Sequence, residues 1–337
     1  MRDTLRRLLG GRTAGDPDRQ LRTDGGTGTE TAGETGGRRF GLGADSIDNE
    51  LLESLPFWLP AALLVGLFVY GAIGWNFLIS LTDWSGLGQP DYSNLSFEMY
   101  RIMIDDANFL AATRNTFVLL IVFTALALVL GLVMAILVDQ GIRFENTFRT
   151  IYLLPMSLSF VVTAIFWSWM YNASSGGINV TLRALGLDFL AMNWLGDPRF
   201  RLAAIIFALM WQFSGYCLIV YLAGLRSIPN EHYEAAKVDG ASTIRMYWCV
   251  ILPQLRASTM SAAVVLMVFA LKAFDFIFVM FGTNPGRSAD ILAVMMYRQA
   301  FSATNWAYGS AIAIVLFVMA LGVIAPYIYM QYQRGEL

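Results

Sequence analysis

Lysine, histidine and cysteine are scarce in this sequence of 337 residues, which holds two lysines, one histidine and two cysteines. Neither Lys237 nor Lys272 follows a glycine, which excludes the Gly-x-x-x-x-Gly-Lys-Ser/Thr loop that binds nucleotide phosphates. The single histidine, His232, leaves a histidine-based metal site or catalytic triad without partner residues. Two cysteines indicate no disulfide framework. We therefore expect no catalytic residue, metal or cofactor in this chain, and no ATP hydrolysis by that route.

Charge is also scarce. Charged residues make up 14% of the chain and hydrophobic residues 56%, whereas a typical soluble protein has about 25% charged residues. The formal net charge of −2 lies wholly in residues 1–53, which hold eight arginines and ten acidic residues. No cluster of basic residues indicates a nucleic-acid partner. This composition argues against an ordinary soluble enzyme.

The first 53 residues are rich in glycine, threonine, aspartate and arginine. Such a segment buries too little apolar surface to offset its chain entropy, so we expect a disordered tail over 1–53. Arg6 and Arg7 are not followed by an apolar run, which argues against a signal peptide.

The remaining chain contains six apolar stretches, each long enough to cross a hydrocarbon core that needs roughly 20 helical residues. Helices satisfy their own backbone groups in lipid, and the runs are continuous rather than alternating, which argues against a β-barrel. The sequence predicts an all-α integral membrane protein with spans near 57–81, 115–138, 150–171, 202–225, 258–281 and 308–331.

The distribution of basic residues favours an inside amino terminus. The loops 139–149 and 226–257 are basic, whereas 82–114 carries five acidic residues and two arginines. With six spans, both termini and the loop 226–257 then lie in the cytoplasm. We expect the chain to be a multi-pass protein of the cytoplasmic (inner) membrane.

The loop 226–257 has the signals of a helix, a break and a second helix. Pro229 is tolerated at a helix start, Glu234 and Lys237 can pair three residues apart, and Gly240 can end the helix at positive φ. Pro253 is expected to separate the loop from the next span. Small side chains around the break would let another protein approach closely. A plain surface helix–turn–helix between two spans is the alternative.

These residues resemble the EAA loop of binding-protein-dependent ABC importer permeases. The family pattern is Glu-Ala-Ala, three residues, Gly, then Ile-x-Leu-Pro, and here it reads Glu234-Ala-Ala-Lys-Val-Asp-Gly240 and Val250-Ile-Leu-Pro253. The likeness extends over roughly 110–335 and is greatest to carbohydrate-uptake permeases of the maltose, glycerol-phosphate and α-glucoside type. Further matching pieces are Asn115-Thr116, Leu154-Pro155, Gly176-Gly-Ile-Asn179, Leu222–Pro229, Phe274-Asp275 and Tyr297–Phe301.

The resemblance implies the type I ABC importer permease fold, with 54–110 as first helix and extracytoplasmic loop and 111–335 as permease core. It also implies partners: a second homologous permease, two ATPase subunits that bind ATP and Mg, and an extracytoplasmic sugar-binding protein. The EAA loop would form the coupling helix that docks in a groove of an ATPase subunit. The residues expected to make that contact are Glu234, Ala235, Ala236, Asp239, Gly240 and Ala241.

Polar residues inside two apolar stretches are candidates for substrate binding. Lys272 and Asp275 lie three apart and can share a helix face; an ionisable group in a span costs about 2.5–3.5 kcal/mol. They would line a sugar cavity, as the resemblance implies, or form a structural ion pair. Gln212 and Tyr216 combine an amide and a hydroxyl with aromatic faces, which suits a sugar. For their neighbours Ser214 and Gly215 helix packing is an equal alternative.

Two other functions remain open on the sequence. One is an ABC permease for an amino acid or a polyamine. The other is a secondary transporter or channel that works without ATP; the EAA loop and the lack of an evident inverted repeat argue against it.

Overall fold

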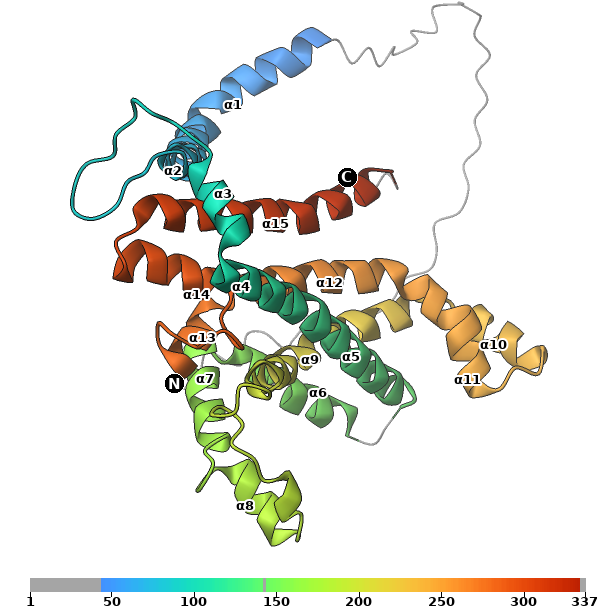
Figure 1. The fold of residues 1–337 in the computed structure, drawn as a ribbon. Coiled ribbons are helices and arrows are strands. Elements are labelled where there is room, and N and C mark those ends of the chain that lie inside the picture. The colour runs from blue at the N-terminus through green and yellow to red at the C-terminus, as the bar shows by residue number, and fades with distance from the viewer. Residues whose placement is uncertain (1–43, 142–143, 334–337) are drawn as a thin grey trace, which may run out of the picture. The chain divides into compact units, whose positions relative to one another are not determined.

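A computed structural model describes residues 44–141 and 144–333, and within these ranges all regular structure is helical (Figure 1). The chain divides into two compact units, 1–60 and 61–337. The predicted tail, 1–53, falls largely outside the described residues; helix α1 begins at Ala44, before the expected end of the tail.

Within 61–333 the longer helices pack in pairs, and the connections range from short turns to the long loops 81–97, 185–200 and 282–291. Their bounds are α1 Ala44–Val65, α2 Ala72–Ser80, α3 Glu98–Asp105, α4 Ala107–Val118, α5 Thr124–Asp139, α6 Glu145–Leu153, α7 Phe160–Met170, α8 Gly177–Ala184, α9 Arg201–Ser227, α10 Asn230–Val238, α11 Thr243–Met246, α12 Arg256–Leu271, α13 Phe274–Phe281, α14 Leu292–Tyr297 and α15 Trp306–Gln333. Five helical runs are long and apolar enough to cross a membrane, or six if one bent pair is a single span.

Four predicted spans match helical runs within a few residues at most ends. These runs are Ser54–Ser80, Ala107–Asp139, Arg201–Ser227 and Trp306–Gln333. The second run begins well before its predicted start because polar residues at 107–116 lower the hydropathy of a segment that is nonetheless helical.

The third predicted span, 150–171, is bent. Its two arms, Glu145–Ser157 and Phe160–Met170, meet at 100°. Pro155 has no N–H to continue the first arm, and Ser159 starts the second by accepting a hydrogen bond from the Val162 N–H at 3.3 Å. The proline ends the first arm and the serine cap begins the second, which allows the bend at this point.

The fifth predicted span, 258–281, is wrong in its bounds. The helical run is Thr243–Leu271, so it takes in the second half of the EAA loop, and α13 is a separate helix beyond a break at Lys272 and Ala273. Pro253 was expected to separate the loop from the span. It lies instead in a 3₁₀ turn, Leu252–Leu255, that continues into α12, because a proline in a first turn costs no hydrogen bond.

Helices α5 and α9 form the most extensive pair of the core. Gly131 on α5 faces Cys217 on α9, and a Cβ at Gly131 would collide with that residue's side chain and backbone. Phe123 and Phe213 meet edge to face, with ring centroids 5.9 Å apart. Small residues at such a crossing let two membrane helices approach closely. This pair holds α9, from whose end the EAA loop departs.

Candidate functional site

The EAA loop folds as the sequence predicts up to the break after its first helix. Gly240 has φ +72°, the left-handed conformation that favours glycine. The N–H of Gly240 donates to the Lys237 carbonyl, and the N–H of Ala241 donates to the Ala236 carbonyl, both at 3.0 Å. This pair of hydrogen bonds is the Schellman motif, which caps α10 and turns the chain toward α11. Ser242 then caps α11 by accepting from the Arg245 N–H at 3.4 Å.

The six predicted coupling residues differ in exposure. Ala236 is 5% exposed and packs inside this chain. Ala241 is half-buried against the same core. The exposed members of the set are Glu234, Ala235, Asp239 and Gly240. Ala236 is therefore a packing residue that holds the cap, while the exposed four are available to a partner.

Two exposed apolar residues of the EAA loop were not among the contact residues predicted from the sequence. Val238 is 87% exposed and Ile244 is 74% exposed, on either side of the Gly240 turn. Exposed apolar residues beside polar ones are typical of the centre of a protein interface. Their signal was present in the sequence, as apolar residues in a polar loop.

An ion pair connects the start of the EAA loop to helix α6. Glu145, at the start of α6, accepts from Arg226 at 2.5 Å and from Arg149 at 2.9 Å through the same oxygen, Oε1. The expected Glu234–Lys237 pair is not among the ion pairs of residues 54–141 and 144–333. Charge thus ties the EAA loop to α6 rather than stabilising α10 from within.

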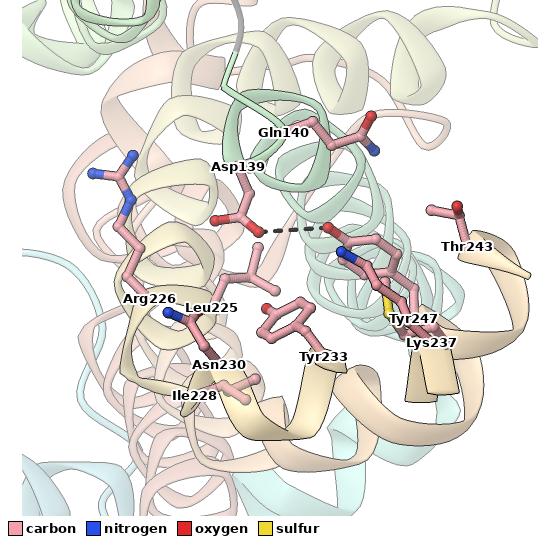
Figure 2. Close-up of a pocket in the computed structure, with 11 residues that line it drawn as sticks. Asp139, Gln140, Leu225, Arg226, Ile228, Asn230, Tyr233, Lys237, Thr243 and Tyr247 are labelled. Carbon is pink, nitrogen blue, oxygen red and sulfur yellow. Dashed lines mark hydrogen bonds between the residues drawn. The ribbon is translucent and has the colours of Figure 1, made fainter. Parts of the chain in front are cut away.

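A polar cavity of about 640 Å³ lies between the EAA loop and the end of α5 (Figure 2). Tyr247 donates from its hydroxyl to Asp139 Oδ2 at 3.4 Å across it. Tyr233 also faces the cavity, and burial, together with the Asp139 carboxylate, raises the pKa of its hydroxyl to about 12. The tyrosine therefore stays protonated and remains a donor at neutral pH.

Gln212 holds the bend of the third span. This residue of α9 is 2% exposed, and its Nε2 donates at 2.9 Å to the Leu158 carbonyl, which lies at the bend. Its Oε1 is buried without a hydrogen-bond partner in the described part of the chain. One half of the amide is therefore structural and the other half is free to accept.

The structure brings together two of the four predicted substrate residues. A cavity of about 340 Å³ beside the bend is lined by Gln212 and Asp275, together with Phe160, Phe213 and other residues. Tyr216 lies about one turn further along α9 and Lys272 lies at the end of α12; neither is among the residues that line this cavity. The cavity combines aromatic rings, an amide oxygen and a carboxylate.

The prediction that Lys272 and Asp275 share one helix face is wrong. α12 ends at Leu271, and Lys272 caps it by donating its own backbone N–H to the carbonyls of Val268 and Phe269. Asp275 belongs to the first turn of the separate helix α13. Both side chains are exposed, and they form no ion pair with each other among the described residues.

Gly215 has a packing role. A Cβ at this position would collide with the carbonyl of Tyr152, so α9 passes directly against the end of α6. Ser214 is buried and donates to the Trp211 carbonyl at 3.4 Å within its own helix. For this pair of residues the structure favours helix packing over a place in the cavity.

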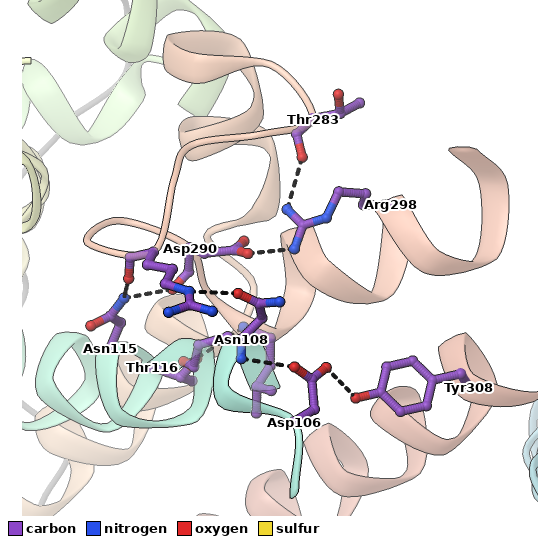
Figure 3. A network of polar contacts seen from close by, with 11 residues as sticks. Asp106, Asn108, Asn115, Thr116, Thr283, Asp290, Arg298 and Tyr308 are labelled. Carbon is purple, nitrogen blue, oxygen red and sulfur yellow. Dashed lines mark hydrogen bonds and ion pairs between the residues drawn. The ribbon is translucent and has the colours of Figure 1, made fainter. Parts of the chain in front are cut away.

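A network of polar contacts at the opposite ends of the spans was not predicted (Figure 3). Asn115 on α4 donates at 2.8 Å to the Arg287 carbonyl and at 2.9 Å to the Asp290 carbonyl. Thr116 accepts from the Leu292 N–H at 3.0 Å. The Asn115-Thr116 piece thus fastens the segment before α14 to α4.

Asp290 and Arg298 form the most buried ion pair of the described residues. The Arg298 guanidinium donates to Asp290 Oδ2 at 2.5 Å and to the Thr283 carbonyl at 3.0 Å. Burial raises the pKa of the Asp290 carboxyl, and Arg298 opposes that shift. Finding this pair requires the fold, because Asp290 stands before α14 and Arg298 follows it.

The Gly176–Asn179 piece also has a structural reason. A Cβ at Gly176 would meet the carbonyls of Asn172 and Met170. Asn179 is 1% exposed; it donates to the Met192 carbonyl at 2.8 Å and accepts from the Trp194 indole at 2.8 Å. This asparagine is the hub of the loop between α7 and α9.

Comparison with known families identifies one match. Residues 127–335 match the model of the binding-protein-dependent transport system inner membrane component. This range contains the EAA loop, Gln212, Asp275 and the whole of α9.

Individual relatives agree with the family match. The chain is 53% identical to the xylose/arabinose import permease of Haloferax volcanii, over 86% of this chain and 92% of the relative. It is 30% identical to a trehalose/maltose transport system permease of Thermococcus litoralis, over 80% and 90%. Among solved structures, a bacterial ABC transporter for alginate matches with a TM-score of 0.71 at 21% identity, over 86% of this chain and 99% of that one, which shows a common fold.

Proposed function

We propose that the solute carried by this chain is a sugar. The chain belongs to the inner-membrane permeases of binding-protein-dependent ABC importers. The chain is an integral membrane transport subunit without an ATPase of its own, and it works with a binding protein and ATPase subunits. The observation that carries the sugar assignment is the 53% identity to a xylose/arabinose permease, sustained over 86% of the chain. Pentoses are therefore the first substrates to test.

The EAA loop is the surface that contacts an ATPase subunit in this proposal. The Gly240 turn presents Val238, which is 87% exposed, with Glu234 and Asp239 exposed beside it. Such a patch has an apolar centre and a polar rim, as protein interfaces do. The side that receives the loop is cytoplasmic, which puts both termini in the cytoplasm.

The translocation path would be shared with a second homologous permease. Lys272 and Asp275 are exposed in this chain, although they interrupt an apolar stretch. Exposure to lipid would be costly for both, so a polar cavity or a partner chain must face them. We assign sugar contacts to the Gln212 oxygen, to Asp275, to the exposed Lys272 and to the half-buried Tyr216.

The full transporter then contains this chain, the second permease, two ATPase subunits and an extracytoplasmic sugar-binding protein. ATP and Mg bind to the ATPase subunits. Closure of the ATPase pair would pull the EAA loops and switch the cavity between outward and inward access, a rigid-body change between discrete states.

The test is stimulation of ATPase activity in the reconstituted transporter across a panel of solutes on the binding protein. We expect xylose or arabinose to raise ATP hydrolysis and to enter vesicles. Stimulation by an amino acid or a polyamine alone would overturn the sugar assignment. Uptake that continues with inactivated ATPase subunits would indicate an ATP-independent transporter instead.

A further inference from the structure

An apolar groove of about 420 Å³ adjoins the polar cavity at the base of the EAA loop. Gln140, Thr243 and Tyr247 line both spaces, so the two spaces lie side by side. The rest of the groove is lined by Val129, Leu132, Val133, Ile136, Ile244, Trp248 and Leu252. The two adjoining spaces together offer a polar end and an apolar end.

The two ends lie at different depths of the same span. The groove follows α5 from Val129 toward Gln140, and α5 is the last part of the apolar run Ala107–Asp139. The ten helical rises from Val129 to Asp139 cover about 15 Å, which is half of a hydrocarbon core of about 30 Å. The polar cavity begins where this run ends, at Asp139. Trp248, 70% exposed at the groove, is typical of the membrane interface.

The polar end offers hydrogen-bond donors that the chain itself leaves unused. The Tyr233 hydroxyl is buried without a hydrogen-bond partner among the described residues. Lys237 makes no ion pair within the described ranges, whereas Arg226 is already bonded to Glu145 at 2.5 Å. The lining contains one carboxylate, Asp139, which accepts a hydrogen bond from the Tyr247 hydroxyl. The unused donors, the Tyr233 hydroxyl and the Lys237 ammonium, suit the oxygens of an anion.

We propose that these two adjoining spaces together bind one phospholipid of the leaflet next to the EAA loop. The phosphate diester would accept from Lys237 and from the Tyr233 hydroxyl, and an acyl chain would fill the groove along α5. Free phosphate would occupy the polar end alone, because it has no apolar part to fill the groove. Because the lipid contacts both α5 and the loop, its presence would brace the EAA loop against the bundle.

The experiment uses the assembled transporter with its ATPase subunits, purified in nanodiscs of phosphatidylcholine with a minor share of phosphatidylglycerol. Native mass spectrometry counts the phosphatidylglycerol that stays bound after release from the disc. Three variants are compared with the parent: Lys237→Gln at the polar end, Val133→Trp to fill the groove, and Arg245→Gln as the control. Arg245 is an exposed cation of the same loop that lies outside both linings.

We expect Lys237→Gln to lower retained phosphatidylglycerol about fivefold, which corresponds to about 1 kcal/mol for one cation near a membrane surface. Val133→Trp should displace the lipid at unchanged charge, and Arg245→Gln should retain it. Equal retention in all four proteins would overturn the proposal.

Two further outcomes would also overturn it. One is competition by glycerol phosphate, which has no acyl chain, as effective as competition by phosphatidylglycerol; the site would then bind a free anion. The other is crosslinking of the Val133→Cys variant to an ATPase subunit, which would make the groove a protein interface. Neither readout uses sugar, so the result is independent of the proposed substrate.

Discussion

Gly240 allows the sharpest test of the EAA loop. The perturbation is Gly240→Val, with Gly240→Asn as the matched control. Both substitutions add a side chain at the same exposed position, and a Cβ there meets nothing within 4 Å in this chain. They differ in the backbone, because asparagine tolerates the left-handed region and valine does not.

The magnitude follows from the turn geometry. A residue other than glycine at φ +72° costs about 1–2 kcal/mol, with valine at the upper end because it is β-branched. That free energy shifts the population of the capped turn by about 5–30-fold. Valine should therefore weaken the hydrogen bonds from Gly240 and Ala241 that end α10, while asparagine keeps them.

The assay is the ratio of sugar transported to ATP hydrolysed in proteoliposomes, at equal amounts of inserted protein. We expect the ratio to fall severalfold for Gly240→Val and to stay near the parent value for Gly240→Asn. Equal losses in both variants would show that a partner's surface excludes any side chain, and the turn argument would fail. A normal ratio in both would contradict a coupling role for the loop.

Three other changes test the remaining features. Single replacement of Lys272 or Asp275 by alanine should reduce transport, and exchanging the two residues should give no rescue because they lie on separate helices; full rescue would restore the ion-pair interpretation. Gln212→Leu should raise the KM for sugar and cost about 1 kcal/mol of stability through loss of the Leu158 hydrogen bond, and an unchanged KM in uptake assays would remove Gln212 from the path. Arg298→Met should lower the thermal midpoint by leaving the Asp290 carboxylate buried and unpaired. The pKa of Asp290 is raised in the folded state, so stabilisation by its proton is present at low pH and lost as pH rises through that value. The Arg298→Met deficit should therefore shrink on acidification, and a deficit that grew would refute the pairing.

The parts predictable from the sequence are those that local chemistry decides. The EAA loop break needs only a glycine at positive φ after a short helix, and that is what Gly240 supplies. Four of the spans follow from hydropathy because continuous apolar runs have few alternatives in lipid.

The parts that the sequence left unpredicted depend on contacts between distant segments. Pro155 signals a possible break, but the 100° bend is held by Gln212, which comes from another helix. The break at Lys272 separates two charged residues that hydropathy places in one run. Asp290 and Arg298 are unremarkable in the sequence until the fold puts them on one network.

Glu145 gives the EAA loop a second mechanical connection. Force applied to α10 reaches α9 through the chain itself, and it reaches α6 through the single oxygen that Arg226 and Arg149 share. The arm Glu145–Ser157, which contains α6, would then move with α9. Helix α7 lies beyond the bend and need not follow that motion. Arg226 is 49% exposed at its side chain, so dissolved ions screen this connection. Rising ionic strength should loosen the joint motion of α6 and α9 before it affects the buried contacts of the bundle.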